Sequence, residues 1–200
     1  TMANDSALSG VVSGNATITK AGTGTLSLNG SNTFVGSLAV GEGKVAINNA
    51  NSLGANSNSV SLANNTGLTT TAAVTAQQGV AATGNVMIDT MANDSTLSGV
   101  VSGNAAISKA GTGTLSLNGT NTFVGSLAVT EGKVAINNAN SLGANSNSVS
   151  LANGTSLETT AAVTAQQAVV ANGNVTINTA GNNSTLSGVV SGNATLTKVG

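Results

Sequence analysis

Residues 22–47 read GTGTLSLNGSNTFVGSLAVGEGKVAI, and residues 111–136 repeat this string with two changes. Within it, Leu, Val and Ile alternate with Ser and Ala in short triplets, a period of two that is typical of strands with one buried face. Gly and Asn, which tolerate positive φ, separate the triplets and favour turns. Residues between the apolar positions are expected to face outward. The positions expected to point inward are Leu26, Leu28, Val45, Ile47, Val60 and Leu62.

The whole chain is built from a longer repeat of 89 residues. Residues 1–89 and 90–178 are the same sequence with 13 substitutions, and residues 179–200 begin a third copy. Two copies this similar exclude a protein with two domains that perform different tasks. We therefore expect one continuous domain over residues 1–200, organised as a tandem array.

A shorter period lies within each copy and averages about 22 residues, a length typical of one solenoid coil. It is marked by two rows of apolar positions that each advance in four steps through one copy. In both rows the four steps add up to the 89 residues of one copy, which predicts four coils per copy and about nine coils in the chain. The first row comprises Ile18, Leu38, Val60, Val86 and Ile107, and the second Leu26, Val45, Leu68, Leu97 and Leu115.

Coils of this length predict an all-β fold, a single-stranded parallel β-helix. Parallel strands normally need helical crossovers, and no sustained helical pattern is visible in the sequence. A solenoid avoids crossovers because each coil bends through short turns and returns one strand higher. The Ala-rich stretch Leu68–Ala82 is ambiguous and would also accommodate a helical turn. A sandwich of antiparallel hairpins is the alternative architecture.

The composition excludes most chemical functions. Only 6% of the 200 residues are charged, the net charge is −1, and Cys, His, Arg, Tyr, Trp and Pro are absent. Without Cys and His there is no zinc, haem or iron–sulfur ligand set, and no thiol nucleophile or His-based triad. The five Lys are scattered along the chain and do not form the basic patch that binds a nucleic-acid backbone. No apolar run approaches the roughly 18 residues that a membrane-spanning helix needs. We expect no cofactor, no metal, no nucleic-acid partner and no membrane insertion by this segment.

The lysines recur at fixed places in the repeat. Lys20, Lys109 and Lys198 are one copy apart, as are Lys44 and Lys133. At about 4.8 Å per coil, equivalent lysines would lie roughly 19 Å from each other. That separation exceeds the Debye length of about 8 Å, so they cannot act jointly on a small anion. We interpret these lysines as solvated charges on turns.

The acidic residues do not predict a catalytic pair. Asp5 recurs as Asp94 but becomes Asn183 in the third copy, whereas Glu42 and Glu131 persist. Glycosidases need two carboxylates about 5–10 Å apart, and each Glu stands four or more residues from another acid. We expect no enzymatic activity and no catalytic, cofactor-binding or metal-ligating residue.

Asn and Phe are interpreted as structural residues. Asn at stacked turns can form ladders of side-chain amides, and we favour this role over glycosylation of the Asn-x-Ser/Thr triplets. Phe34 and Phe123, the only aromatic residues, are expected to fill the interior at a wide turn. Drift of residues 17–19 from Thr-Ile-Thr to Ala-Ile-Ser at residues 106–108 argues against an ice-binding face.

The stretch that opens this section resembles the autotransporter passenger-associated β-strand repeat. That motif runs Gly-x-Leu-x-Leu-x-Gly-x-Asn-Thr-aromatic-x-Gly, followed by a strand, a Gly and a further strand. Phe stands here where Tyr is commoner, and Leu38-Ala39 replaces a pair of Thr. The resemblance covers about half of each copy and implies a right-handed β-helix on a bacterial cell surface. Matching positions are Leu26, Leu28, Gly30, Asn32, Thr33, Phe34, Gly36, Val40, Gly43, Val45 and Ile47, and in the second copy Leu115, Leu117, Gly119, Asn121, Thr122, Phe123, Gly125, Val129, Gly132, Val134 and Ile136.

Two functions follow from these expectations. The first is a structural and adhesive extracellular segment, a rigid stalk in a bacterial surface protein that meets a host or a neighbouring cell. The alternative is a subunit or segment of a self-assembling extracellular filament or sheath. Neither end of the sequence resembles the polar cap of a soluble solenoid. We therefore expect further copies of the repeat in the same chain, or end-to-end self-association.

Overall fold

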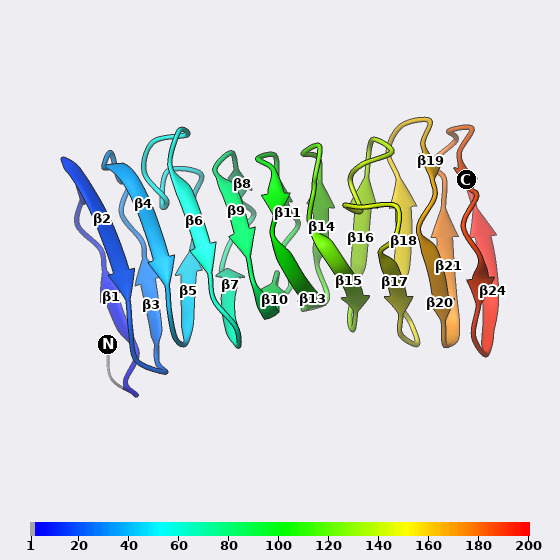
Figure 1. Cartoon of the computed structure of the whole chain (residues 1–200), viewed down its shortest axis with the longest axis horizontal. Helices are drawn as coiled ribbons and strands as arrows, with labels where there is room; N and C mark the ends of the chain where they lie inside the picture. The colour runs from blue at the N-terminus through cyan, green and yellow to red at the C-terminus, as the bar shows by residue number, and fades with distance from the viewer. Residues whose placement is uncertain (1–2) are drawn as a thin grey trace.

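The computed structural model describes residues 3–200, which form an elongated solenoid of stacked strands (Figure 1). The coils advance along the long axis from the N-terminal end to the C-terminal end. The strands pair in parallel throughout their stacks. No segment of residues 3–200 is helical, and none could span a membrane as a helix. The expected all-β parallel solenoid is confirmed.

Four sheets form the walls of the solenoid. The long sheet contains β1 (Ser6–Leu8), β3 (Thr25–Leu28), β5 (Lys44–Ile47), β7 (Thr66–Thr70), β10 (Gly84–Asp89), β13 (Asn104–Ala110), β15 (Val124–Val129), β17 (Ser148–Leu151), β20 (Ala168–Ala171) and β23 (Val190–Ser191). The five-stranded sheet contains β2 (Asn15–Lys20), β4 (Val35–Val40), β6 (Ser59–Leu62), β9 (Gly79–Ala82) and β12 (Val101–Ser102). The seven-stranded sheet contains β8 (Thr75–Ala76), β11 (Ser95–Leu97), β14 (Thr114–Leu117), β16 (Lys133–Ile136), β18 (Ser156–Thr159), β21 (Gly173–Asn178) and β24 (Ala194–Val199). The two-stranded sheet contains β19 (Thr164–Ala165) and β22 (Thr185–Leu186).

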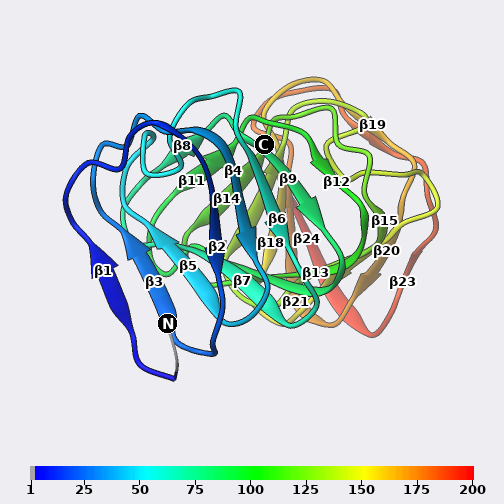
Figure 2. The same ribbon diagram turned by 60° about the vertical axis from the view of Figure 1, so that its left-hand side comes forward.

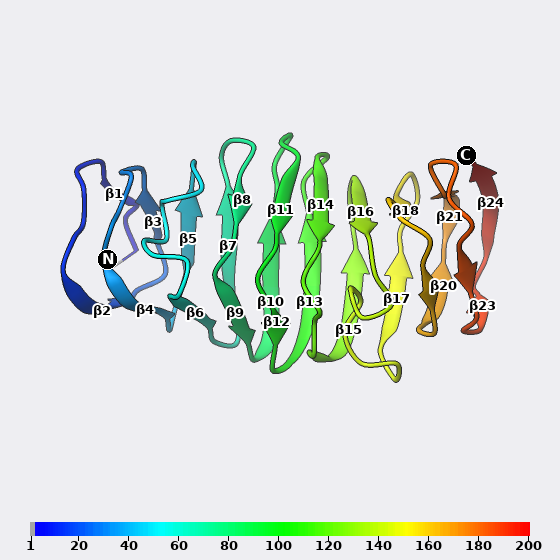
Figure 3. The same ribbon diagram turned by 90° about the horizontal axis from the view of Figure 1, so that it is seen from above.

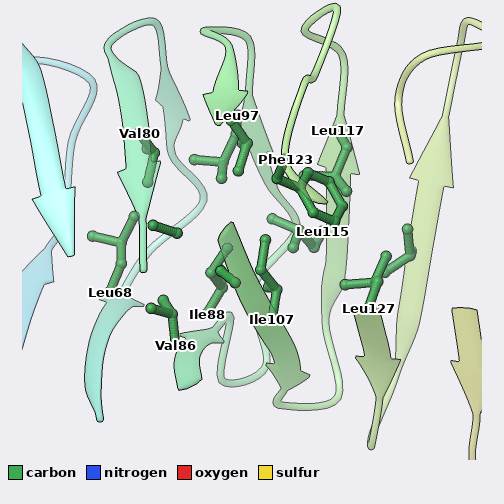
Figure 4. Close-up of a cluster of buried hydrophobic side chains, with 14 of the residues drawn as sticks. Leu68, Val80, Val86, Ile88, Leu97, Ile107, Leu115, Leu117, Phe123 and Leu127 are labelled. Atoms are coloured by element: carbon green, nitrogen blue, oxygen red, sulfur yellow. The ribbon is translucent and has the colours of Figure 1, made fainter. Parts of the chain in front are cut away.

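The core is a layer of small aliphatic side chains between these walls. All six positions expected to point inward are buried, and Leu28, Val45, Ile47, Val60 and Leu62 are fully buried. Phe34 and Phe123 are also fully buried, as expected. Figure 4 shows side chains from different coils meeting in the interior, Ile88 and Ile107 among them.

The strict alternation breaks at Ala46 and Ala135, and also in β7, where all five residues are buried. Ala46 and Ala135, between two inward residues of β5 and β16, were expected to face solvent and are instead 4% and 3% exposed. Ala46 pairs with Ser27 on one side and with Thr69 on the other. Thr69 is itself buried, so the outer face of β5 is covered there, whereas the corresponding neighbour of Ala135 is the partly exposed Glu158. The expectation that every intervening residue faces out is wrong at these two positions.

The expected stacking of the first apolar row is wrong at one step. Val60 pairs with Val80 and not with Val86. Val86 belongs to a different sheet and pairs there with Ile107, as expected for the next step of the row. The long step from Val60 to Val86 therefore includes part of a further coil.

The second row is wrong beyond Leu68. Leu68 pairs with Ile88 and not with Leu97, so this long step also includes part of a further coil. Leu97 in turn pairs with Leu117, two positions beyond the expected Leu115. Residues that pair lie one coil apart, and this interval is nearly constant along the chain. The two long steps, from Val60 to Val86 and from Leu68 to Leu97, exceed it and therefore cannot each be one coil.

The Ala-rich stretch Leu68–Ala82 accounts for the error. It forms no helical turn but contains the short strands β8 and β9. With β7, these two strands make one coil whose three sides belong to three different sheets. The bent outline of the coils is visible in the turned view of Figure 2.

The three-sided coil changes how the repeat fits the solenoid. β1 lies in the long sheet in the first coil, and its counterpart one copy later, β11, lies in the seven-stranded sheet in the fifth coil. β2 and its counterpart β13 shift in the same sense, from the five-stranded sheet to the long sheet. One copy thus takes about four and one third coils, not four. The ten strands of the long sheet give ten coils in place of the expected nine (Figure 3).

The first prediction concerns the interior row. Leu28 is fully buried and pairs with Leu8 and Ile47 of the adjoining coils. Leu28→Ala should lower the free energy of unfolding by about 2–5 kcal/mol, because it removes buried methyl groups and leaves a cavity. Ser27→Ala, next to it on the outer face, should change this free energy by less than about 0.5 kcal/mol. Urea unfolding followed by circular dichroism measures both, and equal losses would contradict the assigned faces.

Candidate functional site

Three carboxylates of the chain brace neighbouring coils. Asp94 Oδ1 accepts the backbone N–H of Thr114 at 2.7 Å, and Asp5 makes the same kind of bond to Thr25 in the first copy. Hydrogen bonds from Thr114, above all from its backbone N–H, hold the pKa of Asp94 below its usual range. Glu42 Oε2 accepts the backbone N–H of Gly22 at 3.0 Å. Within residues 3–200, no three Asp or Glu gather in a way that could hold a metal ion.

Two lysines lie inside the solenoid. Lys20 is 1% exposed and Lys109 is fully buried, so their interpretation as solvated turn charges is wrong, whereas Lys198 is exposed as expected. The strand is longer than the triplet around Ile107 suggests: β13 continues to Ala110, and its alternation points Ile107 and Lys109 inward. Lys109 therefore occupies an apolar row, paired with Ile88 below and Val129 above.

The buried ammonium groups are held by backbone carbonyls. Lys109 Nζ donates to the carbonyl oxygens of Ala110 at 2.9 Å, Gly111 at 2.6 Å and Glu131 at 3.2 Å. Lys20 makes the corresponding three bonds in the first copy. Because the third carbonyl belongs to the following coil, each lysine ties two turns together.

Burial sets the protonation of these lysines. Desolvation lowers the pKa of Lys109 to about 8, against the opposing attraction of Asp89, Glu131 and Asp94. Desolvation also lowers the pKa of Lys20, whose charge is favoured by Glu42. Loss of solvation penalises an ammonium ion even when every proton finds an acceptor.

The Asn side chains do not form the expected extended ladders of like amides. Asn58 Oδ1 accepts the backbone N–H of Gly36 at 2.8 Å, and its Nδ2 donates at 2.9 Å to the carbonyls of Phe34 and Leu53. Asn147 repeats this arrangement in the second copy. Each buried amide thus supplies hydrogen-bond partners to backbone groups at a turn, where these groups have no partner in the pairing between strands.

Amides of neighbouring coils do meet in single pairs. Asn56 Nδ2 donates to Gln77 Oε1 at 2.9 Å, and Asn145 donates to Gln166 over the same distance in the second copy. Both pairs lie on exposed turns and join two coils each. The structural role expected for Asn is therefore present, but mainly through bonds to the backbone.

A groove of about 410 Å³ lies on the outer face of the long sheet, across β5, β7, β10, β13 and β15. Its walls and rim carry Lys44, Asn65, Asn85, Ser108 and Ser126. None of these five side chains forms a hydrogen bond or ion pair within residues 3–200. Apart from Lys44, nothing in the sequence singles them out, because scattered polar residues become neighbours only through the register of the coils.

A counterpart of this groove occurs one copy later, on the seven-stranded sheet. It has a volume of about 430 Å³ and is lined in part by Lys133, Gly154 and Thr176, which replace Lys44, Asn65 and Met87. The two grooves lie on different sheets because one copy of the repeat does not correspond to a whole number of coils. Each one forms where the strands of one copy meet those of the next.

Comparison with known proteins confirms the resemblance seen in the sequence. Residues 18–47 and 107–136 each match the model of the passenger-associated-transport-repeat, so the chain is similar to that family at two places one copy apart. The chain is also similar to an adhesin BmaC autotransporter of Brucella suis biovar 1 (strain 1330), with 37% identity over 94 residues. This match covers 47% of the chain but only 3% of the adhesin. No solved structure matches the chain significantly.

The second prediction uses the buried lysine as a pH probe. The pKa of Lys109 is about 8 in the folded chain and 10.5 unfolded, so the unfolded chain binds more protons between these values. The free energy of unfolding should therefore rise with pH from 8 to 10.5, by up to roughly 3 kcal/mol from this residue.

Lys109→Met should remove this residue's contribution to the rise, because it keeps the length of the side chain without the titrating group. Lys133→Met, at an exposed position, is the matched control and should retain the rise. Thermal unfolding of both variants at pH 7 and pH 10 measures the difference. An unchanged pH dependence in Lys109→Met would contradict the burial of its ammonium group.

Proposed function

We propose that this chain is a rigid spacer within the surface-exposed passenger of a bacterial autotransporter-like adhesin. The observation that carries the proposal is the coincidence of the two passenger-associated repeats with a continuous parallel solenoid. Similarity to an autotransporter adhesin supports an adhesive, extracellular setting. Because the chain corresponds to only a small part of that relative, the spacer role is proposed for this segment alone.

The physics of the fold suits a spacer. Each coil is joined to the next by parallel strand pairs, and by side chains such as Lys109 and Asn147 that bridge the turns. Length grows by about 4.8 Å per coil, and bending would break these bonds on one side. A rod of this kind holds whatever it carries at a distance from the cell surface.

A spacer needs no catalysis, and the proposal includes none. Several of the side chains most able to catalyse are occupied with the backbone: Asp94 and Glu42 accept N–H groups, and Lys109 donates to three carbonyls. The filament alternative has no support from the comparisons, and no feature of the described residues favours it over the spacer.

The third prediction tests the rod. Inserting one further copy of residues 90–178 after residue 178 should lengthen the solenoid by about 21 Å, which is four and one third coils at about 4.8 Å each. Small-angle X-ray scattering should show a linear increase in maximum dimension as copies are added, with an unchanged cross-section. Growth of the cross-section instead of the length would overturn the spacer proposal.

The fourth prediction tests location. Antibodies raised against the 200-residue chain should label intact cells that produce the parent protein, and brief protease treatment of those cells should remove the label. A cytoplasmic marker protein, protected in the same cells, is the control. Labelling that requires permeabilised cells would contradict the surface assignment.

A further inference from the structure

The groove on the long sheet has the properties of a binding site. Five polar side chains border it without an intramolecular partner in residues 3–200: Lys44, Asn65, Asn85, Ser108 and Ser126. They come from five consecutive coils and face the same hollow. A volume of about 410 Å³ falls within the range of small-molecule sites, about 300–1,000 Å³.

The floor of the groove is apolar, and one of its residues is smaller than the counterpart in the first copy. Met87, Ala106 and Ala128 contribute methyl and thioether surface. In the first copy, Ser37 Oγ donates to Thr17 Oγ1 at 3.2 Å. Their counterparts here are Ser126 and Ala106, so the partner hydroxyl is missing and Ser126 is left unpaired.

The charge of the groove is positive at one end. Lys44 is half-buried on β5, and its ammonium group forms no ion pair within residues 3–200. Asp89, two residues beyond Met87 on β10, turns its carboxylate to the backbone N–H of Met91 at 2.8 Å. An anionic group placed beside Lys44 therefore meets no carboxylate among the residues that line the groove.

We propose that this groove binds an anionic saccharide, with its carboxylate on Lys44. The C–H face of the sugar ring would lie on Met87 and Ala106, and its hydroxyls would bond the unpaired Asn85 and Ser126 side chains. This inference goes beyond the spacer role and does not depend on it.

A saccharide fits better than an extended peptide. The backbone N–H and C=O groups of β7, β10 and β13 are already engaged in parallel pairing along the long sheet. A peptide lying on this face would therefore find few partners for its own backbone. A sugar needs only side-chain donors and acceptors. Both Phe are buried, so no aromatic ring can stack on the ligand, and the affinity should be in the millimolar range.

The counterpart groove lacks these properties. Asn65 and Met87 are replaced by Gly154 and Thr176. Asn178, which lines it, donates to the carboxylate of Glu158 at 3.0 Å, so a carboxylate lies at this groove and its amide partner is already satisfied. It should bind the anionic sugar more weakly, which makes Lys133 a suitable control position.

Methionine NMR provides a local test. The chain has three Met, so ¹³C-methyl labelling gives three signals, of which Met87 lies in the groove and Met91 does not line it. The full chain would be titrated with methyl β-D-glucuronide and with methyl β-D-glucoside, which differ only in the carboxylate. We expect a saturable shift of the Met87 signal with the glucuronide, with the Met91 signal unmoved.

Lys44→Met should weaken glucuronide binding about tenfold, whereas Lys133→Met should leave the Met87 titration unchanged. An unaltered Met91 signal shows that each variant is folded. Equal shifts with both sugars, or no shift of Met87 at 100-fold molar excess and above, would overturn the proposal. So would an equal response to a blocked Gly-Glu-Gly peptide, which carries the carboxylate without the sugar ring.

Discussion

Parallel pairing of each coil with the next is the constraint on which the rest of the structure depends. Each strand inside the stack finds its backbone partners one coil before and one coil after it, so each inward row must stay in phase along the whole solenoid. Turns must fit the same spacing. At Gly125, where φ is 144°, a Cβ would collide with the carbonyl oxygen of Ala105 in the coil beneath, so only glycine fits. The sequence is repetitive because the hydrogen-bonded neighbours of a coil are other coils.

This pairing also explains why the repeat and the coil have different periods. Coils must stack at a nearly constant interval, whereas one copy of the repeat corresponds to about four and one third of them. In the long sheet, β7 and β10 of the first copy are therefore followed by the long strands β13 and β15 of the next copy, and β10 pairs with β13. The outer surface is uneven at this junction, and the groove beside Lys44 lies there. A repeat of a whole number of coils would place all copies of a strand on one sheet.

Much of the fold could be predicted from sequence because the alternation of Leu and Ser in a triplet directly encodes which face is buried. The number of coils could not, because Ala is small enough to face either way and the strands around Ala76 and Val80 leave little pattern. Lys109 was misplaced for a different reason. Its charge predicts an exposed position. However, β13 continues one alternation beyond Ile107, and three backbone carbonyls accept hydrogen bonds from the ammonium group. The groove could not be predicted, since its residues come from five successive coils and become neighbours only through the register in which those coils stack.

Differences between the copies show which part of the surface is free to change. Residues 42–64 and 131–153 are identical although many of them are exposed, because this segment contains Asn58 and Ser52, whose side chains bond the backbone of its turns. In contrast, many substitutions fall on outward positions of β9 and β10, such as Ala81 and Met87, where the side chains do not fill the interior. An interior one side chain deep cannot vary without disturbing adjacent coils. Variation between the copies is therefore tolerated mainly on the outer sheet faces, and the groove beside Lys44 is one of the places where the copies differ.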